Sequence, residues 1–339
     1  MKRRNWFLLG IYGLVVIVNV LSWYMPCFGD RMRQSVFQVT QYVQGYISSI
    51  VTFSLGEFLL LFAVILMTGA FLLLLTGLCK KAAAAFKKGR GKICGDITEN
   101  SKRSGFEIFC RRYFYSLSWI IGVVSVVMSV NCFVLYHCSS FQDNYMPTVK
   151  RDYTVGELAI LRDYVVRQCN ELAQELKRDE DGYLVYEGDL NRRGILEMKR
   201  MGETYPLFGG YYPMPKKFTF SGFFSQQYML GYYFPFSMEA NYNDVMHILN
   251  FPFTMEANYN DVMYIANVPV TICHELSHVK GFIYEDDANF IGYLACTSSE
   301  DPFFRYSGYL SVLDYLNRDL YESLDRSFET YQTYEQCSA

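Results

Sequence analysis

Residues 268–281 read VPVTICHELSHVKG, and this stretch decides how the rest of the chain is interpreted. Pro269 suits the first turn of a helix, and Gly281 suits the position just beyond its end. In a helix between them, His274 and His278 lie four residues apart and project from the same face. The stretch therefore predicts one helix that carries two imidazoles side by side.

This spacing is typical of a zinc hydrolase. Two histidines one turn apart can hold one Zn²⁺ at about 2.0–2.1 Å from each nitrogen. Glu275 lies about 100° further round the helix, where it can reach a water on the metal without binding the metal. Only 4 His occur among 339 residues, and two of them fall here, which disfavours two ordinary surface histidines. We predict His274 and His278 as zinc ligands and Glu275 as general base.

A catalytic zinc site usually has a third protein ligand and an open position for water. An acidic segment follows Gly281, and a second helix that begins there can return its acidic face toward the histidines. Glu285 is the predicted third ligand, and Asn289 lies four residues on, on the same side of that helix. Asp286 and Asp287 remain alternative ligands or, like Asn289, groups that hold a histidine N–H. The competing interpretation is an acidic first turn that only favours the helix dipole.

Composition excludes some other functions. The chain is 51% hydrophobic and 17% aromatic, and its formal net charge of −3 argues against a nucleic-acid partner. The 10 Cys include no Cys-x-x-Cys pair, so a cysteine zinc cluster is not expected. The abundance of aromatic residues suits a protein that lies beside a membrane.

The first part of the chain predicts a membrane anchor. Three apolar runs are each about as long as a bilayer core requires, and the first has no cleavage site typical of a signal peptide. The segment between the second and third runs is rich in Lys and Arg, so the positive-inside rule places it and the N-terminus in the cytoplasm. We expect an anchor over residues 1–137, with spans at about 6–25, 58–78 and 113–136 and a cytoplasmic basic loop at 79–112.

The remaining residues, 138–339, have the composition of a water-exposed domain, which the three crossings place outside the cytoplasm. A helical period over 155–178 predicts a helix packed on a core. The fold class expected is mainly α: three transmembrane helices followed by an extracytoplasmic α+β zincin-like domain.

A tandem duplication precedes the histidine motif. Residues 234–250 are repeated almost unchanged as 251–267. Because only the second copy adjoins the motif, we expect the first to be looped out or to form an added hairpin. His247 in the first copy is a poor ligand candidate, because Tyr264 replaces it in the second.

Other site residues are predicted less directly from the sequence. Two pieces, Tyr232–Asn243 and Phe251–Asn260, suggest an extended edge to which a peptide adds as a strand, with Glu256 and Asn258 as candidates. Tyr306, near the start of a later amphipathic helix, is a candidate to hold the oxyanion, although packing is an equally simple role for it.

Several segments resemble the DUF3810 family of uncharacterised bacterial membrane proteins. The resemblance is carried by PFTMEANYN, CHELSHVKGF, EDDANF and IGYLAC, and also by FSLGE and PMPKK, so it covers most of the chain. It implies a multi-pass protein of the bacterial cell membrane with a zinc-peptidase-like motif. Separately, Glu285-x-x-Ala288-Asn289 is similar to the Glu-x-x-Ala-Asp segment of gluzincin peptidases, in which the Glu binds zinc. A metzincin-like alternative puts Tyr284 at the third ligand position, where Tyr is a poorer zinc ligand.

The sequence thus predicts a membrane-anchored zinc peptidase that acts on a peptide or protein substrate outside the cytoplasm, in contact with the lipid bilayer. The main rival is an envelope module that binds metal or peptide without turnover. An intramembrane protease is a second rival, disfavoured because the apolar run before the motif is short and is interrupted by Asn267 and Pro269.

Overall fold

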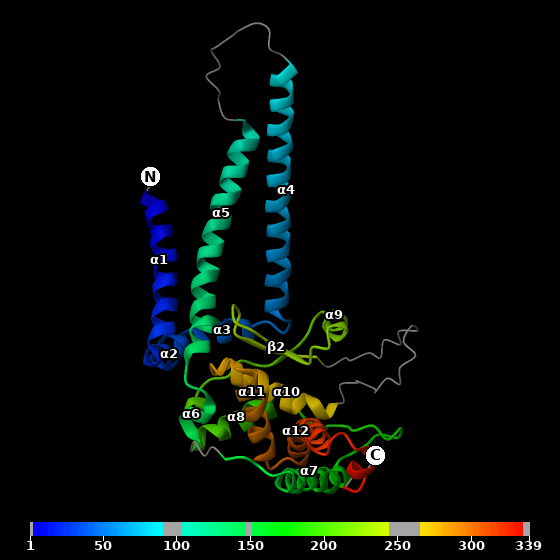
Figure 1. Ribbon diagram of the computed structural model, residues 1–339. Helices are drawn as coiled ribbons and strands as arrows, with labels where there is room; N and C mark the ends of the chain where they lie inside the picture. Colours follow the sequence, from blue (N-terminus) through cyan, green and yellow to red (C-terminus); the bar gives the residue numbers. More distant parts are fainter. Residues whose placement is uncertain (1–2, 91–103, 147–150, 244–264, 335–339) are drawn as a thin grey trace. The chain divides into compact units, whose positions relative to one another are not determined.

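The computed structural model describes residues 3–90, 104–146, 151–243 and 265–334, and the chain in these ranges is mainly helical (Figure 1). It divides into two compact units. The first contains Met1–Ile17 and Gly56–Val127, and the second contains Val18–Leu55 and Met128–Ala339.

Three long helices confirm the predicted apolar spans. They are α1 (Arg3–Tyr24), α4 (Leu55–Arg90) and α5 (Gly105–Met128), and α5 continues through η2 (Ser129–Phe133) and η3 (Leu135–His137). All three are long and apolar enough to cross a membrane. Their large apolar side chains are mostly exposed, as expected of helices that need an apolar solvent rather than a protein core.

The chain between the first two spans is helical and belongs to the second unit, so a boundary at residue 137 does not describe the division. It forms α2 (Pro26–Met32), η1 (Arg33–Phe37) and α3 (Gln38–Ser49). The physical reason is a set of polar contacts with the later chain. Gln41 Nε2, for example, donates to the Tyr211 carbonyl at 2.8 Å.

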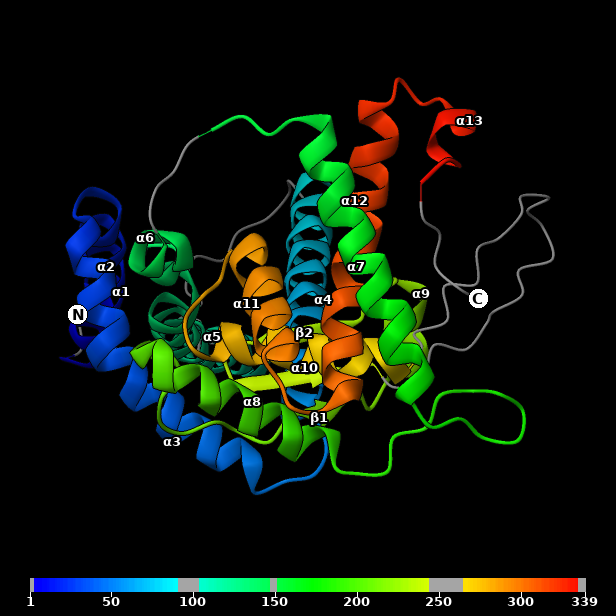
Figure 2. The same cartoon turned by 90° about the horizontal axis from the view of Figure 1, so that it is seen from below.

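The second unit is built around α10 (Val268–Val279), which packs against several helices and the sheet. Figure 2 shows α7 lying along α12, and Val165, Val166 and Leu313 are buried between them. The unit's other elements are α6 (Phe141–Tyr145), α7 (Val155–Glu175), α8 (Leu190–Thr204), η4 (Pro206–Phe208), α9 (Ser221–Gln226), η5 (Ile265–Asn267), α11 (Glu285–Thr297), α12 (Pro302–Ser323) and α13 (Phe328–Tyr331).

Three short strands form one sheet in the order β1-β3-β2. They are β1 (Lys216–Lys217), β2 (Gly231–Phe234) and β3 (Glu239–Tyr242). β2 runs antiparallel to β3, and β1 runs parallel to it. β3 is therefore central, and β2 is an edge strand among the described strands.

The duplicated segment is not looped out in the described part of its first copy, because residues 239–242 form β3 and are all buried. This part instead forms a hairpin, since β3 pairs antiparallel with β2 across the turn at 235–238. Polar contacts fix this strand: the Glu239 carboxylate accepts hydrogen bonds from Lys216 Nζ and, at 3.0 Å, from the Leu55 N–H. Ser237 Oγ donates to the same carboxylate at 2.7 Å. Residues 251–264 of the second copy lie outside the described residues.

Candidate active site

The histidine motif lies on α10, bounded as the sequence predicts. Pro269 occupies the first turn of the helix, and Gly281 follows it with φ +88°, a conformation that favours glycine. The Phe282 N–H then bonds back to the Ser277 carbonyl at 3.2 Å, which closes the helix end. This turn lets the chain reverse into α11, which begins at Glu285.

Close packing of α10 and α11 brings the predicted ligands together. A Cβ at Gly292 would lie 3.1 Å from the Val270 carbonyl oxygen, so only a glycine allows α11 this approach without displacement. One turn further along α11, Cys296 Sγ lies 3.9 Å from Cys273 Sγ in the core. This close packing directs Glu285, at the start of α11, toward α10.

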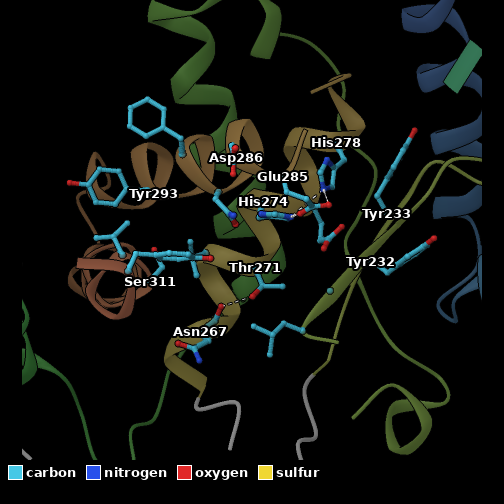
Figure 3. A pocket seen from close by; sticks show the side chains of 18 of the residues that line it. Tyr232, Tyr233, Asn267, Thr271, His274, His278, Glu285, Asp286, Tyr293 and Ser311 are labelled. Carbon is cyan, nitrogen blue, oxygen red and sulfur yellow. Dashed lines mark hydrogen bonds and ion pairs between the residues drawn. The ribbon is translucent and has the colours of Figure 1, made fainter. Parts of the chain in front are cut away.

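His274, His278 and Glu285 converge on one point (Figure 3). The two Nε2 atoms are 3.1 Å apart, and Glu285 Oε2 lies 3.2 Å from His274 Nε2. Glu285 Oε1 lies 3.8 Å from His278 Nε2. Ligand atoms around a tetrahedral zinc ion at 2.0–2.1 Å are roughly 3.3 Å apart. The residues therefore fit a zinc ion with little rearrangement.

The tautomer of His278 also suits a metal. Its Nδ1 lies 2.7 Å from the Phe282 carbonyl oxygen, which can only accept a hydrogen bond. Nδ1 must then carry the proton, and the neutral ring presents a lone pair at Nε2. His274 also has a side-chain hydrogen bond with Asn289, which raises the pKa of its imidazole, so the imidazole N–H donates and the amide oxygen of Asn289 accepts.

The charges of the three groups are complementary without an ion. Burial, followed by the charge of His274, lowers the pKa of His278 to about 4. Burial also lowers the pKa of His274, but the Glu285 hydrogen bond and the nearby carboxylates outweigh it and raise that pKa overall. The His274 hydrogen bond lowers the pKa of Glu285.

The environment of Glu275 differs from that of His274, His278 and Glu285. Its side chain is buried, and Oε2 has no hydrogen-bond partner among the described residues. Burial raises the pKa of this carboxyl to about 8. A buried carboxyl with a free oxygen beside the ligands has the position and the proton affinity of a general base.

Metal-free protein should lose stability between pH 6.5 and 8 because of Glu275. Its folded pKa of about 8 lies above its unfolded value of 4.5, so its contribution is present below pH 4.5 and is lost as the pH rises through 8. The opposite shift at His278 acts only below its unfolded pKa of 6.5. We expect wild type to lose about 2 kcal/mol more than Glu275→Gln across this window. Denaturant unfolding of chelator-treated protein measures the difference, and equal losses in the two proteins would contradict it.

β2 packs against Glu275. A Cβ at Gly231 would lie 2.4 Å from Glu275 Oε1 and 2.8 Å from Thr271 Cγ2, so a side chain at this position has no room. The backbone of an edge strand therefore lies directly against the proposed base. Sequence analysis missed Gly231, because the contact joins residues far apart in the chain.

Gly231→Ala should displace Glu275 and reduce turnover while zinc remains bound. Overpacking of this kind costs about 1–3 kcal/mol. Gly222→Ala is the matched control, because a Cβ there meets nothing within 4 Å. Peptide turnover and zinc content of both variants measure the effect; a Gly231→Ala protein as active as the control would show that β2 does not position Glu275.

A cavity of about 1350 Å³ opens over the four residues. One wall is β2 with the preceding residues, and the opposite wall is the face of α12 that carries Ser311, Asp314, Tyr315 and Arg318 (Figure 3). These residues recur at spacings of three and four, which places them on one helix face. This polar stripe was not predicted from the sequence, although its period is visible, because only packing decides which face of α12 lines the cavity.

The other predicted site residues do not join the cluster of His274, His278 and Glu285 in the described part of the chain. Asp286 lines the cavity. Asp287 instead accepts a hydrogen bond from the Phe141 N–H at 3.0 Å, so it serves the fold of α6 rather than the ligands. Tyr306 packs against the cluster between α7 and α12, so the structure gives it the packing role rather than contact with the ligands. Glu256 and Asn258 lie outside the described residues.

The chain matches one family model, "Protein of unknown function (DUF3810)", over residues 33–255 and 249–337. The chain belongs to the DUF3810 family. The two matched segments overlap at residues 249–255, where the first copy of the repeat meets the second, as expected if the family pattern contains this segment once. No curated protein and no solved structure matches the chain significantly.

Proposed function

We propose that this DUF3810 protein is a membrane-anchored zinc peptidase that hydrolyses peptide bonds outside the cytoplasm. The observation that carries the proposal is the convergence of His274, His278 and Glu285 beside the buried Glu275, whose Oε2 has no hydrogen-bond partner among the described residues. Two imidazoles, one carboxylate and a base in an open cavity form the donor set of a catalytic rather than a structural zinc site.

Each residue has a defined role in this proposal. His274, His278 and Glu285 bind the ion, and the Phe282 carbonyl and Asn289 keep the imidazoles oriented. When bound, zinc supplies a Lewis acid and lowers the pKa of a water molecule. Glu275 Oε2 would accept a proton from the water that attacks the scissile carbonyl carbon, and would pass this proton to the amine as the C–N bond breaks. A nearby cation lowers the pKa of Glu275, so the carboxylate form needed for the first transfer is favoured.

The substrate is proposed to bind as an extended strand along β2. β2 pairs with β3 on one side only among the described strands, and its residues 231–233 line the cavity. Backbone N–H and C=O groups on such an edge can pair with a peptide of any sequence. β2 overlaps the Tyr232–Asn243 piece that the sequence predicts as such an edge, whereas Glu256 and Asn258 lie outside the described residues and stay predictions.

Zinc content of the purified full-length protein tests the proposed site. We expect about one zinc ion per chain in wild type and loss of roughly 100-fold or more in affinity in His274→Ala and Glu285→Gln, since each removes a ligand. The matched controls are His137→Ala, whose imidazole packs on Trp23, and Asp286→Asn, which lines the cavity without contacting the histidines. Loss of zinc in Asp286→Asn but not in Glu285→Gln would reassign the third ligand.

Peptide cleavage by the zinc-loaded protein separates the enzyme from its rival. Chelator-sensitive cleavage in a broad peptide library supports the peptidase. Stoichiometric zinc without cleavage of any peptide favours the module that binds metal or peptide without turnover.

A further inference from the structure

The outward face of α3 is apolar, although it belongs to the unit that carries the zinc ligands. Its exposed large side chains recur at spacings of three and four, so they form one continuous stripe. They are between 48% and 70% exposed, and they are Val39, Tyr42, Val43, Tyr46, Ile47 and Ile50. The buried face of α3 carries Gln41, Gly45 and Ser48 instead, which inverts the polarity of a helix on a water-soluble domain.

Hydrogen bonds hold α3 in this orientation. Gln41 Nε2 donates to the Tyr211 carbonyl at 2.8 Å, and Lys216 Nζ donates to the Ser48 carbonyl at 2.7 Å. Tyr211 OH also donates to Ser49 Oγ at 3.2 Å. Rotating the apolar stripe inward would break these bonds, so the stripe is fixed outward.

The sequence around this stripe carries no charged side chain. Residues 34–56 include no Asp, Glu, Lys or Arg, although much of this segment is exposed. A contiguous apolar surface without charge marks a contact with a partner or a membrane.

The covalent chain keeps α3 close to a bilayer. α1 ends at Tyr24 and α4 begins at Leu55, and both are candidate membrane spans. Six residues after Ser49 the chain has entered α4, and six residues extend to about 20 Å at most. A helix tethered at this distance from the membrane reaches its interfacial layer.

We propose that the outward stripe of α3 lies in the interfacial layer of the lipid bilayer, so that α3 rests on the membrane between the first two spans. The Tyr rings suit the headgroup level, and the aliphatic side chains suit the adjoining acyl chains. The polar face, which usually meets water in such helices, here binds the domain. The zinc-ligand unit is thereby held at the membrane surface.

Hydroxyl-radical oxidation of the full-length protein in lipid nanodiscs, with one copy per disc, tests this surface. Tyr42 and Tyr46, 56% and 58% exposed, should oxidise roughly tenfold more slowly than Tyr183, which is 65% exposed on the same unit. Equal rates would overturn the proposal. Protection that appears only with two copies per disc would assign the stripe to self-association instead, and this also contradicts it.

A second observation concerns the substrate, and the inference drawn from it rests on the proposed function. The cavity wall includes Cys132 and Tyr136, which belong to the last turns of the third candidate span. Tyr284, the residue before Glu285, donates to the Tyr136 carbonyl at 2.6 Å and packs on its ring. The end of this span is therefore joined to the helix that carries the third ligand.

We infer from this wall that the site takes polypeptides anchored in the same bilayer and cuts them near the anchor. The test uses peptides with two identical cleavable segments, one near an acyl anchor and one about thirty residues away, in vesicles containing the protein. Preferred cleavage of the near segment supports the inference, and equal cleavage of both overturns it. Absence of zinc-dependent cleavage of either segment would instead refute the peptidase itself, while the α3 test would still stand.

Discussion

Glu275→Gln should abolish peptide hydrolysis while leaving zinc bound. The substitution keeps the size of a side chain that is buried against Gly231, but its amide cannot accept the proton of the water. General-base catalysis contributes about 10²–10⁴-fold, so turnover should fall by at least 100-fold. Turnover of a fluorogenic peptide and zinc content of the same preparation measure both parts of the expectation.

The control for this variant is its stability. Burial disfavours the charged form of Glu275, as its raised pKa shows. The uncharged amide of Gln avoids this cost, so the variant should be at least as stable as wild type at neutral pH. A folded, zinc-loaded Glu275→Gln protein with wild-type turnover would refute the assignment. Loss of zinc in this variant would also contradict it, because Glu275 would then belong to the ligand set.

The local part of the site was predictable from the sequence because its signals are local. Pro269 and Gly281 bound one helix, and the spacing of His274 and His278 places both on one face. Glu285 follows one short turn later, so few conformations connect it to the histidines. The three apolar spans follow from length and composition in the same way.

The distant part of the site depends on packing between segments far apart in the chain. Gly231 meets Glu275 only after β2 has docked on α10, and the stripe on α12 faces the cavity only after α11 has turned back. Tyr306, for which the sequence left an oxyanion role and a packing role open, packs against the apolar cluster between α7 and α12. Residue type alone carries no information about these contacts.

For the duplicated segment, the sequence does not show which copy forms the strand, since two nearly identical stretches have the same local preferences. The first copy supplies β3, where the Glu239 carboxylate is fully buried and pairs with Lys216. Adjacency to the histidine motif favoured the second copy at the sequence level. In the structure, Lys216 instead pairs with Glu239 of the first copy, which follows β2 after a short turn.

Glu239→Gln should destabilise the protein strongly, and Glu256→Gln, the equivalent change in the second copy, should not. Removing one partner of a buried ion pair leaves the other charge unpaired and costs about 3–5 kcal/mol. The Lys216 ammonium would retain only the Ser48 and Phe53 carbonyls as acceptors, at 2.7 and 2.9 Å. Thermal unfolding of the full-length protein in detergent, with the two variants side by side, measures the difference.

The double variant makes this comparison decisive. If the first copy alone forms β3, Glu239→Gln and the double variant should unfold at the same temperature. If the copies exchange, each single variant should be tolerated because the intact copy takes the central position in the sheet, and only the double variant should be destabilised. The second result would overturn a fixed assignment of β3. Either copy could then form the central strand, because Glu239 and Glu256 are equivalent partners for Lys216. The strand would be selected by Lys216 and the edge of β2, and not by one copy of the repeat.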